Sequence, residues 1–149
     1  MGIKSQIEVR MIKSVQFRNF KVLRDATLPL GRFTLIVGPN GSGKSTALQA
    51  LQAVTNPPQF YMVATAGLQS KADTAVEVVL QWGTPYEGVV STAHWSPSDY
   101  SLSHQDSRGM RLPDSESLSL RAKWTEVRIY SLDAAVVAHH GHWIQPAKH

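Results

Sequence analysis

The feature that most constrains this 149-residue chain is a glycine-rich run between an apolar segment and a helix-compatible segment. The run reads GPNGSGKS, from Gly38 to Ser45. The five residues before it, 33–37 (FTLIV), are mostly apolar and are typical of a short strand buried on both faces. Residues 44–54 are rich in Ala, Leu and Gln, with apolar residues at helical spacing. The sequence therefore predicts a strand, a tight loop and a helix in succession.

The spacing of this run is that of the Walker A motif, G-x-x-x-x-G-K-[ST]. Its glycines permit turns that a Cβ would forbid and let backbone amides approach phosphate oxygens closely. The helix that follows directs its positive end at the same anion. We expect Lys44 to supply a charge to the β- and γ-phosphates, Ser45 to offer a hydroxyl to Mg²⁺ and Thr46 to support the phosphates. The candidate phosphate-binding residues are Gly38, Pro39, Asn40, Gly41, Ser42, Gly43, Lys44, Ser45 and Thr46. A chance match is the alternative, and the predicted strand and helix on either side favour a nucleotide site.

The remainder of the chain is predicted to be rich in strands. Alternating residues before Phe20 indicate a strand, and residues 26–30 a second one, which Pro29 confines to a sheet edge. Further strands are expected over residues 76–81, 88–93 and 124–130, with a long serine-rich loop near 94–117. We therefore expect one α/β domain over 1–149. Residues 11–56 form its strand, loop and helix core, and residues 57–149 form an antiparallel, β-rich subdomain.

Composition narrows the class of protein. Hydrophobic residues make up 42% of the chain and charged residues 17%, which excludes a disordered tail and a coiled coil. The formal net charge of +4 permits contact with nucleic acid without requiring it. Because the chain has no cysteine, disulfide scaffolds and thiolate zinc sites are excluded. No apolar run approaches the ~20 residues that span a bilayer, and no signal peptide is found, so we expect a cytoplasmic protein without a membrane partner.

A second motif precedes the glycine run. Residues 12–21 read IKSVQFRNFK, and residues 35–46 read LIVGPNGSGKST. The pairing of an N-F-[K/R] strand end with a G-P-N-G-[S/A]-G-K-S loop at about this distance resembles the start of bacterial RecF/SMC-like and OLD-like ATPases of the ABC class, within the AAA family. The resemblance covers roughly residues 11–56 and is more specific than Walker A alone. Residues 127–133 also resemble a strand of these ATPases, more weakly.

The resemblance implies the N-terminal lobe of a P-loop ATPase head that uses ATP and Mg²⁺. Such heads form a homodimer or higher oligomer with nucleotide at the interface, and hydrolysis releases it. Lys44 would then be catalytic, Lys21 would lie near the nucleotide or be a solvated strand-end lysine, and Asn40 would face the hydrolytic region. Relatives couple the nucleotide state to DNA, in DNA repair, or to an effector protein in anti-phage defence.

Three elements of that family are not found in the sequence. A Walker B strand ends in Asp-Glu, whereas the nearest run, residues 129–133, is interrupted by Ser131 and followed by Ala134. Residues 102–105 match the family's signature motif only by chance, and no switch histidine is identified. We therefore expect an incomplete head, either a fragment or one completed by another chain, that binds nucleotide weakly and turns it over negligibly by itself. A non-hydrolysing nucleotide sensor or scaffold that orders a partner protein is the main alternative, and a small kinase is a third.

Smaller signals have ordinary interpretations. The four histidines near the end of the chain are expected to be an exposed polar segment rather than a metal site. The four tryptophans are expected to pack in the core or at a protein interface rather than to stack on bases. An early cluster of basic residues is either a phosphate-contacting patch or a solvated strand face. The cluster consists of Lys4, Arg10, Lys13, Arg18, Lys21, Arg24 and Arg32.

Overall fold

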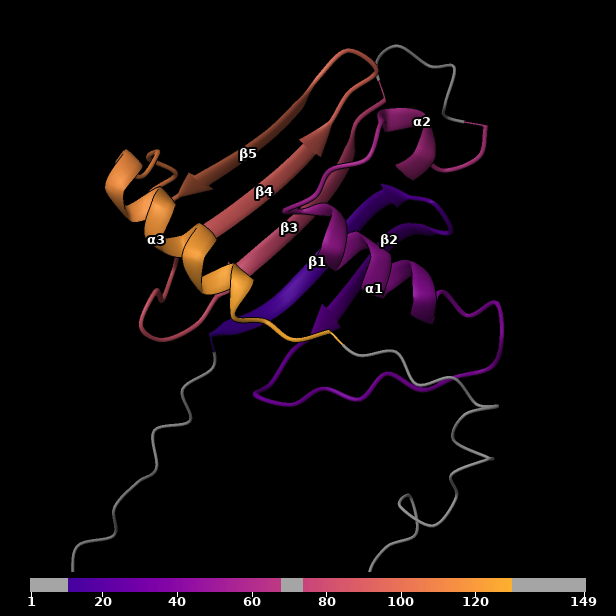
Figure 1. The fold of residues 1–149 in the computed structure, drawn as a ribbon, viewed down its shortest axis with the longest axis horizontal. Helices are drawn as coiled ribbons and strands as arrows, with labels where there is room; N and C mark the ends of the chain where they lie inside the picture. Colours follow the sequence, from indigo (N-terminus) through magenta and orange to yellow (C-terminus); the bar gives the residue numbers. More distant parts are fainter. Residues whose placement is uncertain (1–10, 68–73, 130–149) are drawn as a thin grey trace, which may run out of the picture.

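A single antiparallel sheet organises the computed structural model, which describes residues 11–67 and 74–129. Its five strands lie in the order β2-β1-β3-β4-β5. They are β1 (Ile12–Phe20), β2 (Leu23–Pro29), β3 (Val76–Trp82), β4 (Val90–Trp95) and β5 (Tyr100–Gln105). The helices are α1 (Lys44–Ala53), α2 (Phe60–Val63) and α3 (Asp114–Thr125). Figure 1 shows α1 and α3 in front of the sheet, with α3 lying across the ends of β3, β4 and β5.

One face of this sheet is apolar and carries the core. Register pairs Val15 with Leu80 and Phe17 with Val78, so these four side chains lie on the same face. The alternate positions hold polar residues, among them Arg18, paired with Glu77 through an ion pair of 2.9 Å. The sheet therefore has one buried face beneath the helices and one polar face, as alternating strands predict.

Tryptophans fill the space between the sheet and the helices. Trp82, Trp95 and Trp124 are buried, which confirms the core interpretation for these three, while Trp143 lies outside the described residues. The Trp95 indole packs edge-on against Phe20, with ring centroids 6.1 Å apart, and its Nε1 donates to the Pro58 carbonyl at 3.1 Å. The prediction that Phe20 belongs to the core is therefore confirmed.

Several predicted elements are confirmed with shifted ends. The strand before Phe20, the edge strand containing Pro29, the strands near 76–81 and 88–93 and the helix after the glycine run are all present. β2 lies at one edge of the sheet, where Pro29 is tolerated. The α/β fold with an antiparallel sheet is likewise confirmed. The division of the chain at residue 56 stays a prediction.

Three predicted elements are wrong. Residues 33–37 form no strand, and the side chains of Phe33, Leu35 and Val37 are 85%, 64% and 77% exposed, because no described strand pairs with them. The expected loop over 94–117 contains the end of β4, all of β5 and the start of α3. The expected strand over 124–130 begins instead as the end of α3, and residues 127–129 are irregular. Among the described residues, no helix is long and apolar enough to span a membrane.

Candidate phosphate-binding site

The glycine run forms an open loop between β2 and the first residue of α1. Within it, the Ser42 N–H donates to the Pro39 carbonyl at 3.3 Å, which closes a turn. Gly41 and Gly43 adopt left-handed conformations, with φ of 82° and 92°. L-residues with a Cβ seldom adopt this region, so the turn requires glycine at both positions.

Two of the glycines are also needed for space. A Cβ on Gly43 would lie 3.0 Å from Leu23 Cδ2, at the start of β2. A Cβ on Gly38 would lie 3.0 Å from Ser42 Oγ, on the opposite side of the loop. A methyl group at either position would therefore press on a neighbouring side chain, of Leu23 or of Ser42.

The beginning of α1 presents amide hydrogens to this loop. The first intrahelical bond runs from the Ala47 N–H to the Gly43 carbonyl at 2.9 Å. The amides of residues 44–46 precede that bond, and the geometry of a helix start gives them no intrahelical acceptor. The positive end of the helix dipole adds to their attraction for an anion. The described loop and helix thus provide the cradle that the motif predicts.

Lys44 places a positive charge at the mouth of the loop. Its Nζ donates to the Pro39 carbonyl at 2.6 Å, to the Gly38 carbonyl, and to Ser42 Oγ at 3.5 Å. These acceptors belong to the loop itself, so the ammonium lies across the cradle rather than on a distant partner. Ser45 and Asn40 are exposed beside it, and Thr46 is half-buried.

The residues at the start of α1 fit the chemistry of a nucleotide with Mg²⁺. An exposed serine hydroxyl next to a lysine and free amides is the donor and ligand set that such a complex uses. Ser45 would hold the metal, which neutralises phosphate charge when bound. The assignment of roles to these residues stays a prediction.

The structure places Lys21 on the flank of α1. Lys21 has φ of 49°, in the turn between β1 and β2, and its Nζ donates to Gln49 Oε1 at 2.6 Å. Its backbone is held as well, because its N–H donates to the Val63 carbonyl at 2.7 Å and its carbonyl accepts from Thr65 Oγ1 at 2.6 Å. Val22 of the same turn and Leu23, the first residue of β2, lie beside Gly43 of the glycine loop. The structure therefore brings Lys21 to α1, the helix that follows the glycine loop, while a contact with nucleotide stays a prediction.

Other predicted positions lie elsewhere. Lys13 and Arg18, from the basic cluster, are each paired with a carboxylate, of Glu87 and Glu77, and Lys4 and Arg10 lie outside the described residues. Residues 102–105 belong to β5, within the sheet. The terminal histidines and residues 130–133 lie outside the described part of the chain. Within the described part, no group of three or more His, Cys, Asp or Glu residues is placed to hold a metal ion.

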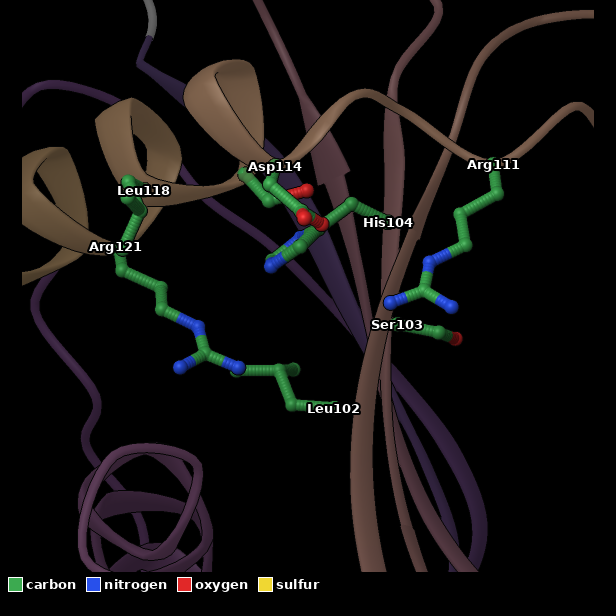
Figure 2. A pocket seen from close by; sticks show the side chains of 8 residues that line it. Leu102, Ser103, His104, Arg111, Asp114, Leu118 and Arg121 are labelled. Atoms are coloured by element: carbon green, nitrogen blue, oxygen red, sulfur yellow. The ribbon is translucent and has the colours of Figure 1, made fainter.

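A cavity between β5 and α3 was not predicted from the sequence. Its volume is about 200 Å³. Figure 2 shows His104, Arg111, Asp114 and Arg121 around it. No sequence motif marks these residues, which are contributed by one strand, the following loop and a helix.

Known proteins share part of this sequence. The family model described as AAA ATPase domain matches residues 11–105, which is more than half of the chain. An OLD nuclease of Thermus scotoductus is 35% identical over 80 residues, covering 51% of this chain and 15% of that protein. A sulfate/thiosulfate import ATP-binding protein CysA of Synechocystis is 44% identical over 52 residues, covering 34% of this chain and 15% of that protein. The chain thus aligns with about 15% of the length of each of these relatives.

Proposed function

Because the chain belongs to the AAA ATPase domain family, we propose that its described residues form the ATP-binding part of an OLD-like ATPase head. The observation that carries the proposal is the cradle from Gly38 to Thr46, with Lys44 across its mouth and three helix amides behind it. The printed name of the CysA relative includes ATP binding, which supports the same ligand.

Hydrolysis requires more than this cradle. Phosphoryl transfer depends on positioning and charge neutralisation, and a water molecule must also be oriented. Lys44 and the amides would bind and orient the phosphates. Within residues 11–67 and 74–129, no strand ends in the Asp-Glu pair that would hold Mg²⁺ and polarise water. We propose that a second lobe supplies this acid, from this polypeptide or from another chain.

The exposed segment 33–37 supports the proposal of a second lobe. Its Phe33, Leu35 and Val37 side chains alternate along the chain and are all largely exposed, directly before the phosphate loop. An apolar strand pattern without a described neighbour is suited to pairing with a strand of the missing lobe. The small share of each relative that is matched leaves ample length for such a lobe.

The partners in the complete assembly are also proposals. We propose that two heads associate with ATP between them and that hydrolysis separates them, which links the nucleotide state to DNA processing or to a defence effector. The relative's name, OLD nuclease, supports an output that involves nucleic acid. If exposed basic residues contact DNA, the logarithm of affinity should fall with the logarithm of salt concentration, and a flat response would count against DNA contact.

The central experiment is a calorimetric titration of the protein with ATP and Mg²⁺. Lys44→Ala should abolish saturable binding, because it removes the only charge placed across the cradle among the described residues. Lys123→Ala is the matched control, since Lys123 forms an exposed ion pair with Glu126 on α3, and its affinity should equal that of the parent. Unchanged ATP affinity in Lys44→Ala would overturn the proposal.

Turnover distinguishes the proposed ATPase part from a non-hydrolysing scaffold. The 149-residue chain should release phosphate from ATP at a negligible rate, since the water-orienting acid is not found in it. Vigorous hydrolysis that depends on Lys44 would contradict the need for a second lobe. If a longer chain with a Walker B acid binds ATP without hydrolysing it, the result would favour the non-hydrolysing scaffold over the ATPase.

A further inference from the structure

The C-terminal end of α1 is held by a tyrosine of β5. Tyr100 Oη donates to the carbonyl of Val54, the C-cap residue of α1, at 2.5 Å. The last carbonyls of an α-helix have no N–H partner within the helix, so they take their donors from elsewhere. The last turn of α1 holds no basic residue that could supply one. The Tyr100 hydroxyl therefore provides a hydrogen bond that the helix itself does not.

The ring that carries this hydroxyl is fixed by its neighbour on β4. Tyr100 is paired across the sheet with Trp95, and the two ring centroids lie 4.8 Å apart. Trp95 Nε1 donates to the carbonyl of Pro58, in the chain that follows α1, at 3.1 Å. The hairpin of β4 and β5 thus holds the end of α1 and the chain after it through two carbonyl groups.

A second hydrogen bond holds α1 halfway along its length. Lys21 Nζ donates to Gln49 Oε1 at 2.6 Å. Gln49 lies five residues after Lys44 and five residues before Val54. At a rise of about 1.5 Å per residue, each arm is about 7.5 Å long. Without the bond at Val54, α1 would be free to pivot at Gln49, and a displacement of one end would appear with the same size at the other.

The face of α1 that packs on the sheet is made mostly of small side chains. Its buried residues are Ala47, Ala50, Leu51 and Ala53. Alanine side chains form shallow ridges, which interlock less with a neighbouring surface than larger side chains do. The hydrogen bonds at Gln49 and Val54 therefore contribute to fixing the direction of the helix axis.

The other end of α1 depends on that direction. The amides of residues 44–46 can bind phosphate oxygens only at N···O distances of about 2.7–3.2 Å and with nearly linear geometry. A helix start that moves by about 1 Å loses part of these bonds. The fixed end of α1 and the phosphate-binding end are therefore parts of one rigid lever.

We propose that Tyr100 is a positioning residue for phosphate binding, because its hydroxyl fixes one end of α1 and thereby the direction of the amides at the other. The inference rests on the proposed binding of ATP at the glycine loop. Burial raises the pKa of Tyr100 to about 12, against the opposing positive charge of Arg121. The hydroxyl therefore remains a donor even at about pH 10, where an ordinary tyrosine is half ionised.

The variant Tyr100→Phe removes the hydroxyl and keeps the ring that packs on Trp95. Calorimetric titration of the 149-residue chain with ATP and Mg²⁺ should give an affinity about three to ten times lower than that of the parent, the usual value of one hydrogen bond. Inorganic tripolyphosphate should lose affinity by the same factor, since the amides contact phosphates and not the base. An unchanged ATP affinity, or a loss confined to ATP, would overturn the inference.

The matched control is Tyr86→Phe. It removes the same hydroxyl from a ring that packs on Trp82, with centroids 5.7 Å apart, rather than from the ring at the end of α1. Its affinity for ATP should equal that of the parent. An equal loss in both variants would assign the effect to stability in general and would overturn the positioning role.

A second measurement follows the direction of α1 in the ligand-free protein. Residual dipolar couplings of backbone N–H groups report how α1 is oriented relative to the sheet. Tyr100→Phe should change the couplings of residues 44–53 as a group relative to those of β1 and β3, whereas Tyr86→Phe should not. Unchanged couplings in Tyr100→Phe would overturn the inference.

The parent protein separates this inference from the proposed function. A parent that binds neither ATP nor tripolyphosphate would overturn the proposed function, and the positioning role with it. A parent that binds both, together with a Tyr100→Phe variant of the same affinity, would overturn the positioning role alone.

Discussion

The sheet and the segment from 31 to 43 use the same kinds of residue in opposite environments. Val15, Val76 and Val78 lie in the sheet with no solvent exposure, whereas Val37 and its apolar neighbours are largely exposed. The sheet residues have paired strands on their flanks and helices above one face. Among the residues that the structure describes, the segment 33–37 has neither a paired strand nor a helix that covers it. Burial is therefore set by the available neighbours rather than by apolar character.

This contrast distinguishes the sheet, which its own packing stabilises, from the segment 33–37, which presents apolar side chains to a partner. Strand pairing and tryptophan packing account for the sheet. The segment before the phosphate loop retains a local contact, from the Gly31 N–H to Thr34 Oγ1 at 3.0 Å. Substitutions in the two regions should therefore differ sharply in their effect on the free energy of unfolding.

The largest expected loss of stability follows from Trp95→Ala. The indole is buried against Phe20 and Tyr100 and donates to the Pro58 carbonyl. Truncation should lower the free energy of unfolding by about 3–5 kcal/mol, through lost burial and a cavity. Urea unfolding followed by circular dichroism measures this change. A loss below 1 kcal/mol would show that the sheet face is packed more loosely than the structure indicates.

Gly43→Ala should have the next largest effect. Its φ of 92° and the 3.0 Å approach of a new Cβ to Leu23 Cδ2 both oppose the substitution, which should cost about 1–3 kcal/mol. Gly41→Ala is the control, since it has a positive φ but no atom within 4 Å of a new Cβ. Its cost should be smaller. Equal costs would mean that the close approach to Leu23 contributes nothing to the cost of Gly43→Ala.

The pH dependence of stability should carry a contribution from His104. Because burial and Arg121 lower the folded-state pKa, the unfolded chain binds the proton first as the pH falls below about 6.5. Stability should therefore decrease between the unfolded pKa and the folded pKa, by at most about 1.4 kcal/mol per pH unit for one group. His104→Gln should flatten this part of the curve. An unchanged slope would contradict the shift.

The smallest effect is expected from Phe33→Ser in the exposed segment. Removing an exposed aromatic ring should change the free energy of unfolding by no more than about 0.5 kcal/mol. Association with a completing lobe, by contrast, should weaken if this segment pairs with it. Urea unfolding of the 149-residue chain measures the change in the free energy of unfolding. A binding assay between this chain and the completing lobe measures the change in association. A large loss of stability in the chain alone would mean that Phe33 is buried in solution.

Sequence patterns within a few residues were sufficient to predict the glycine loop, the helix that follows it and part of the sheet. The loop and α1 follow from glycine placement and helix-compatible residues, and β1 and β3 follow from alternation. Residues 33–37 also carry a strand pattern, but a strand forms only where another strand supplies hydrogen bonds. No described strand does so, and the prediction is wrong for that reason.

The errors between residues 94 and 130 have a different cause. Many serines suggested a loop, yet Tyr100, Leu102 and His104 alternate on the buried face of β5. In α3, Pro113 precedes the first turn, acids occupy that turn, and Leu120 and Trp124 are spaced four apart, which are helix signals. The cavity lined by His104 and Arg121 depends on how β5 and α3 pack, and no local pattern contains that information.

The turn at Lys21 has a consequence for how the phosphate loop responds to a ligand. α1 holds this turn through Gln49, and the backbone of Val63 and Thr65 holds it from the other side. Leu23 then stands directly against Gly43. One side of the loop therefore lies against a turn that hydrogen bonds hold to α1 and to residues 63–65, whereas the other side continues into the exposed segment 31–37. We expect any change of loop shape on nucleotide binding to be taken up entirely by that other side, so the occupancy of the loop would be reported to whatever packs on Phe33, Leu35 and Val37.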